Sequence, residues 1–160
     1  MNATLLMART LSDYERGWLE AAIDGEGYIG IRLIKLKRHA SSIEVHARVA
    51  ITNTNTQFLE RARSIAGAGN IWKYDRHNPL HKPRYTLEIH ADSLRWLLPQ
   101  LRLTIKERQR ILFLEYLAIS DCRRRMPRPG HRGSASYTEE QRARINEIYQ
   151  ELRVLNKRGR

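Results

Sequence analysis

The sequence is poor in the features that mark secreted and membrane proteins. It contains one cysteine, Cys122, so it can form neither an internal disulfide nor a cysteine-rich zinc site. No apolar run approaches the roughly 20 residues that span a bilayer, and the first residues lack the apolar core of a signal peptide. We therefore expect an intracellular protein in a reducing compartment, with no membrane segment.

Acidic residues, proline and glycine are also scarce. The 17 acidic residues are outnumbered by 29 lysines and arginines, which gives a net charge of +12. An excess of that size predicts an anionic polymer as partner, with nucleic acid ahead of a membrane surface; a high pI without such a partner is the alternative. Because hydrophobic residues make up 41% of the 160 residues, we expect one folded domain spanning residues 1–160.

Hydrophobic periodicity predicts an α+β fold. Alternating apolar residues indicate strands, and apolar residues at helical spacing indicate helices. The predicted core, residues 12–120, has the order αββαββ followed by further helices, with a basic linker at 123–133 and a last helix at 137–156. The predicted core helices cover residues 12–24, 58–65, 93–100 and 107–121, and the predicted strands cover 28–37, 43–51, 70–74 and 84–90.

Residues 19–27, Leu-Glu-Ala-Ala-Ile-Asp-Gly-Glu-Gly, end the first predicted helix with an acid-Gly-acid-Gly pattern. The two glycines beside Glu26 are expected to let the backbone turn out of the helix and into a strand. This segment resembles the LAGLIDADG motif of homing endonucleases. Residues 20–22 depart from the family's commonest residues, and Glu26 stands where many members carry Asp.

The resemblance, over about residues 12–117, implies a saddle-shaped antiparallel sheet on DNA and additional C-terminal helices. It implies a site-specific double-strand endonuclease that hydrolyses phosphodiester bonds in a long pseudo-palindromic target. One motif per chain implies a homodimer, and the family implies a mobile intron or intein in the cytoplasm or nucleoid of a prokaryote, or in an organelle. An intron RNA maturase and a DNA-binding regulator without cleavage remain alternatives.

The position of Glu26 predicts a metal site. A carboxylate at the C-terminal end of a helix lies in the unfavourable field of the helix dipole unless a cation meets it. Mg²⁺, or another divalent ion such as Mn²⁺, prefers hard oxygen ligands and commonly takes one or two carboxylates together with phosphate oxygens. We predict Glu26 and Gly25 as the metal site. Asp24 is expected to cap or brace the turn, and contact with the metal is the alternative.

The resemblance also implies that two further residues are catalytic. Asn53, at the end of the second strand, and Lys106, after the fourth, stand where relatives hold polar residues that organise catalytic water. Lys106 would then stabilise phosphate charge, although a solvated surface lysine is the alternative. Asn55 is a weaker candidate for the same task.

Small residues form a ridge along the first helix. Gly17, Ala21 and Gly25 are spaced four apart, so they share one face and permit two helices to approach closely. We predict that this ridge is the dimer interface. Packing against the sheet inside one chain is the alternative.

The sheet is expected to read DNA, because a β-ribbon fits the major groove and alternate side chains meet base edges. A single residue of this face can instead be simply solvated. Lysines near the first hairpin tip and the basic linker are better suited to phosphate contacts, although the linker can equally be a disordered tether. The predicted DNA-binding residues are Arg32, Lys35, Lys37, Glu44, His46, Arg48, Asn70, Trp72, Tyr74, Arg76, Arg84, Thr86 and Glu88.

Overall fold

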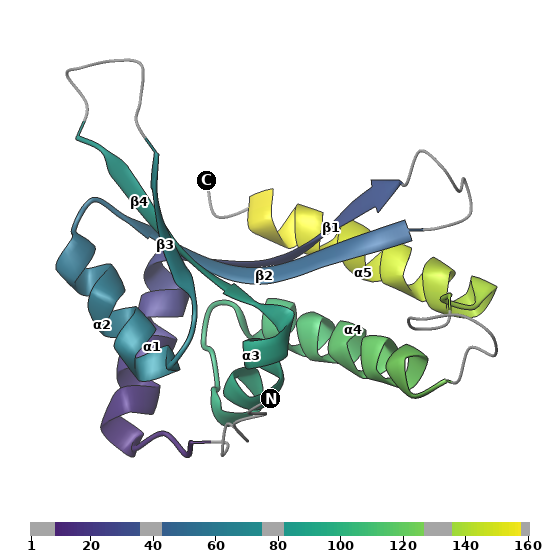
Figure 1. Cartoon of the computed structure of the whole chain (residues 1–160), viewed down its shortest axis with the longest axis horizontal. Coiled ribbons are helices and arrows are strands. Elements are labelled where there is room, and N and C mark those ends of the chain that lie inside the picture. Colours follow the sequence, from purple (N-terminus) through teal and green to yellow (C-terminus); the bar gives the residue numbers. More distant parts are fainter. Residues whose placement is uncertain (1–8, 36–42, 75–81, 127–135, 158–160) are drawn as a thin grey trace, which may run out of the picture.

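The computed structural model describes residues 9–35, 43–74, 82–126 and 136–157. The αββαββ order is confirmed, and it is followed by three α-helices and one 3-10 turn among the described residues (Figure 1). The elements are α1 (Asp13–Glu26), β1 (Gly27–Lys35), β2 (Ile43–Asn53), α2 (Thr56–Ala66), β3 (Asn70–Tyr74), β4 (Arg84–His90), α3 (Ala91–Leu97), the 3-10 turn η1 (Leu98–Gln100), α4 (Glu107–Arg125) and α5 (Glu139–Lys157).

The start of α1 agrees with the sequence, but its end does not. Ser12 is the N-cap, and its side chain forms a reciprocal capping box with Glu15. The helix continues through Glu26, two residues beyond the predicted end. Gly25 is helical, and Gly27 has an extended backbone with φ −87°. The exit from the helix therefore uses no conformation that only glycine adopts.

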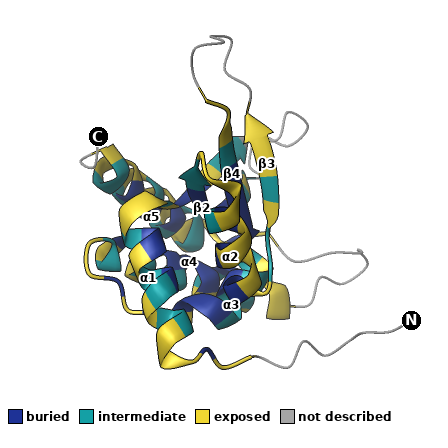
Figure 2. Cartoon of the chain, turned by 90° about the vertical axis from the view of Figure 1, so that its left-hand side faces the viewer, coloured by how far each residue is buried: buried dark blue, intermediate teal, exposed yellow. Residues whose placement is uncertain are grey.

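The four strands form one antiparallel sheet in the order β1-β2-β4-β3. Residues of one parity are buried, among them Ile29, Val49, Ile51, Leu87 and Ile89. Helices α1 to α4 cover this apolar face, and the opposite face of the sheet is not covered by them (Figures 1 and 2). In β2, Ala47, Val49 and Ile51 are buried, whereas His46 and Arg48 between them are exposed, so the alternation of apolar and polar residues corresponds to an alternation in burial.

Both ends of α2 are fixed by local chemistry. The side chain of Asn55 caps the start by accepting from the backbone N–H of Gln57 at 2.9 Å. Gly67 ends the helix in the left-handed conformation, with φ 62°, where a side chain would be strained. Asn55 therefore serves as a helix cap.

The prediction of a basic linker starting at residue 123 is wrong for its first residues. Arg123 to Arg125 form the last turn of α4. Arginine favours helices, and positive charges at a helix C-terminus are stabilised by the helix dipole. Tertiary contacts add to this, because the Arg123 guanidinium lies 4.4 Å from the ring centroid of buried Tyr137. Residues 127–135 of the expected linker lie outside the described residues.

Helix α5 lies along β1, the outer strand of the sheet (Figure 1). Its apolar face, with Ile148 and Leu152, is buried. Near its end, the Asn156 side chain donates to the carbonyl of Ile29 at 2.9 Å, which satisfies an edge group of β1. None of the described helices is long and apolar enough to cross a membrane.

Ion pairs between α4 and α5 give the stability of this region a pH dependence. Arg144 binds Glu115 at 2.6 Å, and this hydrogen bond holds the pKa of Glu115 below its usual value of 4.5. The contribution is therefore present above that value and is lost as the pH falls through the lower, folded pKa. We expect Arg144→Gln to flatten the acid-side decline of the melting temperature. Arg63→Gln, which removes the same charge from α2, should leave that decline unchanged; equal slopes in the wild type and R144Q would contradict this account.

Candidate metal site and nucleic-acid interface

Glu26 lies at the mouth of a cleft of about 850 Å³. The last turn of α1 carries no basic residue, and no described residue forms an ion pair with Glu26. Its exposed carboxylate stands at the negative end of the helix dipole without an ion-pair partner among the described residues, although the charge of Lys106 is near enough to interact with it. This environment favours a bound cation.

Lys106 lines the same cleft as Glu26. It follows the turn η1 and precedes α4, and its ammonium group donates to the backbone carbonyl of Asp24. Burial lowers the pKa of Lys106, while the charges of Asp24 and Glu26 partly offset this effect. The structure therefore brings together two of the three predicted catalytic residues.

Asp24 is fully engaged by the backbone of the segment that carries Lys106. One carboxylate oxygen accepts from Thr104 N at 2.7 Å, and the other accepts from Lys106 N at 2.9 Å. One turn earlier in α1, Glu20 accepts from Arg102 N at 2.7 Å. Acidic side chains of α1 thus hold the loop that positions Lys106, so Asp24 has a structural contact, but to this distant loop and not to the turn at the end of its own helix.

Asn53 is placed differently from the prediction. It does not line the cleft that contains Glu26 and Lys106. Its side-chain oxygen instead accepts from the backbone N–H of Asn55 at 2.8 Å, forming a local turn between β2 and α2. Asn53 therefore has a structural task in this chain, and the structure does not group it with the other two candidates.

The metal-ligand set within one chain is small. Among the described residues, no three His, Cys, Asp or Glu side chains are arranged to hold a metal ion. Each oxygen of Asp24 accepts from a backbone N–H, whereas no hydrogen bond or ion pair is formed by the Glu26 carboxylate among the described residues, so Glu26 is the freer ligand for a cation, with the backbone of Gly25 beside it in the cleft. One free carboxylate still fits Mg²⁺, which keeps water and phosphate oxygens in much of its coordination sphere.

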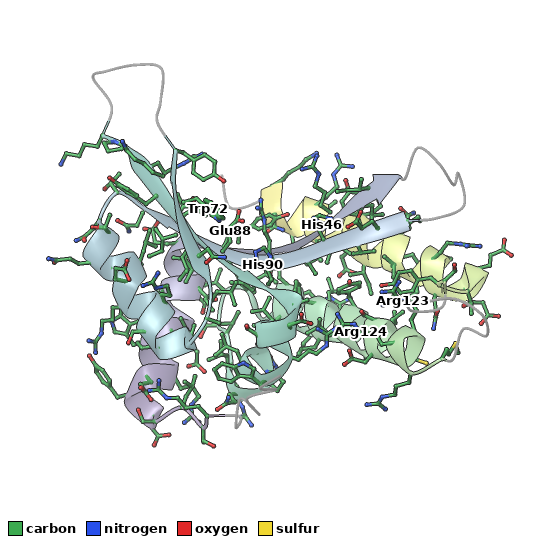
Figure 3. The ribbon with its side chains drawn as sticks, viewed as in Figure 1. His46, Trp72, Glu88, His90, Arg123 and Arg124 are labelled. Atoms are coloured by element: carbon green, nitrogen blue, oxygen red, sulfur yellow. The ribbon has the colours of Figure 1, made fainter. Side chains whose placement is uncertain are left out.

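The uncovered sheet face carries the predicted DNA-binding residues in register. Cross-strand pairs on it include Arg32 with His46 and Trp72 with Thr86, which place side chains of all four strands on one surface (Figure 3). Lys35 ends β1, and Lys37 and Arg76 lie outside the described residues. The predicted residues that share this face are Arg32, Glu44, His46, Arg48, Asn70, Trp72, Tyr74, Arg84, Thr86 and Glu88.

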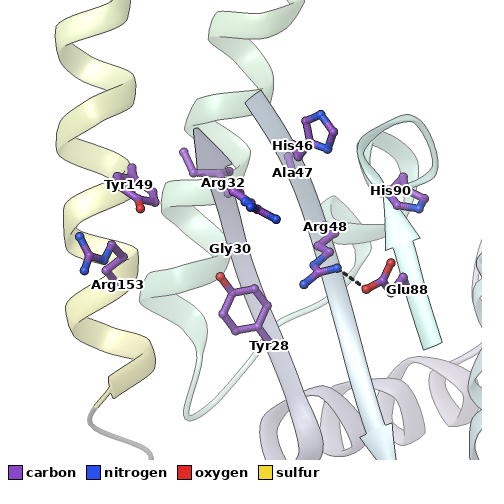
Figure 4. A pocket seen from close by; sticks show the side chains of 11 residues that line it. Tyr28, Gly30, Arg32, His46, Ala47, Arg48, Glu88, His90, Tyr149 and Arg153 are labelled. Carbon is purple, nitrogen blue, oxygen red and sulfur yellow. Dashed lines mark hydrogen bonds and ion pairs between the residues drawn. The ribbon is translucent and has the colours of Figure 1, made fainter. Parts of the chain in front are cut away.

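Several of these residues already have partners within the chain, and the Glu44 carboxylate lies 2.9 Å from Nε2 of His46. Glu88 is 8% exposed and forms an ion pair with Arg48 (Figure 4). Thr86 is 7% exposed, and its hydroxyl is 2.9 Å from that of Thr52. Trp72, by contrast, is 51% exposed and offers a large apolar surface. Exposed residues such as Arg32, Trp72 and Tyr74 are therefore the ones that a ligand can reach on this face.

The small-residue ridge of α1 is exposed. Gly17, Ala21 and Gly25 all face solvent in the single chain, and a Cβ built on either glycine would meet no atom within 4 Å. The alternative that these residues pack against the sheet is therefore wrong. The ridge is a free helix surface of small residues.

Several residues that line the site were not predicted from the sequence. Tyr28 lies in phase with Arg32 on the open face, so strand alternation alone would have identified it. Gln109 and Arg153 also line the cleft that contains Glu26. Tyr149 and Arg153 line a second cleft, which lies over the open sheet face. Residues of α5 had no local signal, because their role depends on where that helix packs.

Comparison with known proteins defines the fold. No family model matches the sequence, and no curated protein matches it. Solved structures match along most of the chain, and the fold is that of homing endonucleases.

Three solved structures illustrate the likeness. I-TnaI has a TM-score of 0.64 and 19% identity, with 91% of this chain and 97% of that chain covered. I-CvuI, solved with DNA, has a TM-score of 0.62 and 15% identity, with 89% and 82% covered. I-SmaMI, solved bound to an uncleaved DNA target in the presence of calcium ions, has a TM-score of 0.66 and 19% identity, with 84% and 44% covered.

Proposed function

We propose that this protein is a site-specific, metal-dependent DNA endonuclease that cuts both strands of a long pseudo-palindromic site as a homodimer. The observation that carries the proposal is the joint placement of Glu26 and Lys106 in one cleft. This cleft lies at the end of a sheet face that presents base-reading side chains, in a chain with the homing-endonuclease fold. The resemblance of residues 19–27 to the LAGLIDADG motif gives independent support from the sequence.

Glu26 and Gly25 would hold Mg²⁺ or Mn²⁺. A bound divalent ion at such a site supplies a water nucleophile and stabilises charge on phosphate oxygens. The protein's own contribution is to present one unpaired carboxylate at a fixed helix end, next to a cation. Solved neighbours were studied with magnesium or calcium, which is consistent with a divalent ion here.

Lys106 would stabilise the negative charge that develops on the phosphate. Removing one such electrostatic group typically lowers a rate by about 100-fold to 1000-fold. We therefore expect Lys106→Met to lower single-turnover cleavage by about 100-fold. Lys157→Met is the matched control, because Lys157 lines the same cleft without contacting Asp24. An equal loss in both variants would mean that general positive charge, and not the position of Lys106, is what matters.

The homodimer is supported by three observations. The chain has one motif, and the ridge of small residues on the motif helix is exposed. The chain covers 97% of I-TnaI but 44% of I-SmaMI, so the second protein has room for another unit of this size. Two copies paired through α1 would place one Glu26 near each scissile phosphate.

Cleavage mapping on a randomised duplex library with Mg²⁺ or Mn²⁺ tests the proposed function directly. A nuclease of this class should yield one recurrent, pseudo-palindromic site with cuts in both strands. Binding to one DNA site without cleavage would indicate a regulator on the same scaffold. Selective binding to structured RNA without DNA cleavage would indicate a maturase and would overturn the proposal.

A further inference from the structure

Two clefts meet at one point of the molecule. The first, of about 440 Å³, lies over the open sheet face and is lined by Arg32, Arg48 and His90. The second is the cleft that contains Glu26 and Lys106. Tyr28 and Arg153 line both clefts, so they form the junction between the base-reading face and the proposed cleavage site.

Tyr28 can lie at this junction because Gly30 has no side chain. A Cβ built on Gly30 would lie 2.8 Å from Cε1 of Tyr28 and closer still to its hydroxyl. The ring therefore lies across Gly30, on the open face of β1, and the side chain as a whole is 40% exposed. A glycine inside a strand often marks such a close approach. The hydroxyl is in this way presented on the surface of the sheet.

Arg153 lines both clefts from α5, across the first cleft from Tyr28. The packing of α5 along β1 fixes its position, and Figure 4 shows Arg153 and Tyr149 on α5 across the cleft from the strand residues. Its guanidinium stacks over the Tyr149 ring at 5.5 Å and forms one long hydrogen bond, of 3.4 Å, to Gln150. No carboxylate among the described residues forms an ion pair with it. Its charge is exposed and uncompensated.

We propose that Tyr28 and Arg153 together bind a backbone phosphate of the DNA strand that runs from the base-reading face to Glu26. This inference rests on the proposed function and adds α5 as a wall of the DNA-binding surface. A guanidinium paired with a phenolic hydroxyl matches the acceptor oxygens of a phosphate diester, and the stacking on Tyr149 preorganises the arginine. Along the first cleft, Arg32 adds a positive charge without an ion-pair partner among the described residues, and a nucleic-acid backbone requires such charge.

The proposal predicts a loss of affinity that is independent of sequence. With calcium in place of magnesium, Arg153→Ala should weaken binding of the selected target and of a mixed-sequence duplex by the same factor, about tenfold. The slope of log affinity against log salt should decrease by about 1 per chain, because one phosphate contact is lost. Tyr28→Phe should weaken both duplexes less and leave the slope unchanged, since the hydroxyl carries no charge.

Arg63→Ala is the control for the loss of one positive charge, because Arg63 lies on α2 outside both clefts, where it pairs with Glu60. The double variant Y28F/R153A should lose less affinity than the product of the single losses, since both groups contact one phosphate. A salt slope for R153A equal to that of R63A, a loss confined to the selected target, or a double variant that loses the full product would overturn the proposal. Failure of the wild type to bind any duplex would instead refute the proposed function.

Discussion

Glu26→Gln is expected to abolish cleavage of both strands while specific DNA binding remains. The amide keeps the size of the side chain and removes the charge, so a divalent ion loses its one free carboxylate in the cleft. A loss of at least about 1000-fold in single-turnover rate corresponds to about 4 kcal/mol of transition-state stabilisation. Gel-shift and cleavage assays on the selected target measure the two properties separately.

The control for this variant lies in the same helix. Glu20→Gln also removes a carboxylate charge from α1, but it retains an oxygen that can accept from Arg102 N, so cleavage should persist. Glu26→Asp keeps the charge and withdraws it by one methylene, so the rate should fall without vanishing. Unimpaired cleavage by E26Q would refute the assignment of Glu26 as the metal ligand.

Ala21→Glu is expected to convert the protein from a dimer into a folded monomer. Ala21 is the middle residue of the exposed ridge, where two helices would approach closely, and a two-fold axis would bring two added carboxylates together. Sedimentation should give a mass near 18.8 kDa for the variant and twice that for the wild type. Cutting of both strands should be lost with the dimer.

The exposure of Ala21 makes this experiment specific. Because the residue is exposed in the single chain, the substitution should leave the chain folded, with an unchanged circular dichroism spectrum. Ala118→Glu, at an exposed position of α4, adds the same charge elsewhere and should leave the dimer intact. A sedimenting dimer of A21E would show that the ridge is not the interface.

Local patterns predicted the sheet and most of the helices. The strands 70–74 and 84–90 and the cap at Ser12 follow from alternation and side-chain chemistry, which act over a few residues. The pairing of Glu26 with Lys106 came from the family resemblance, because the two residues are distant in the sequence and their approach depends on Asp24 holding a loop. Spacing alone does not encode that contact.

The errors have physical causes that lie beyond local sequence. The run from Arg123 was predicted to be a linker, but helix propensity, the helix dipole and a buried ring extend α4 as far as Arg125. Asn53 was expected beside Glu26 and Lys106, but its side-chain oxygen accepts from the backbone of the next turn and the residue does not line their cleft; its catalytic role stays a prediction. The amphipathic pattern of α5 predicted that it packs, but not that it packs beside β1 and brings Arg153 into two clefts.

The place of α5 also decides how two copies of this chain can meet. An edge strand can pair with the edge strand of another molecule. The edge formed by β1, which begins directly after Glu26, is occupied by α5, and Asn156 takes up the carbonyl of Ile29. The remaining edge, β3, is on the far side of the sheet. Joining two sheets through β3 would separate the two Glu26 carboxylates by the width of both sheets, whereas the proposed contact between α1 helices would keep them close together.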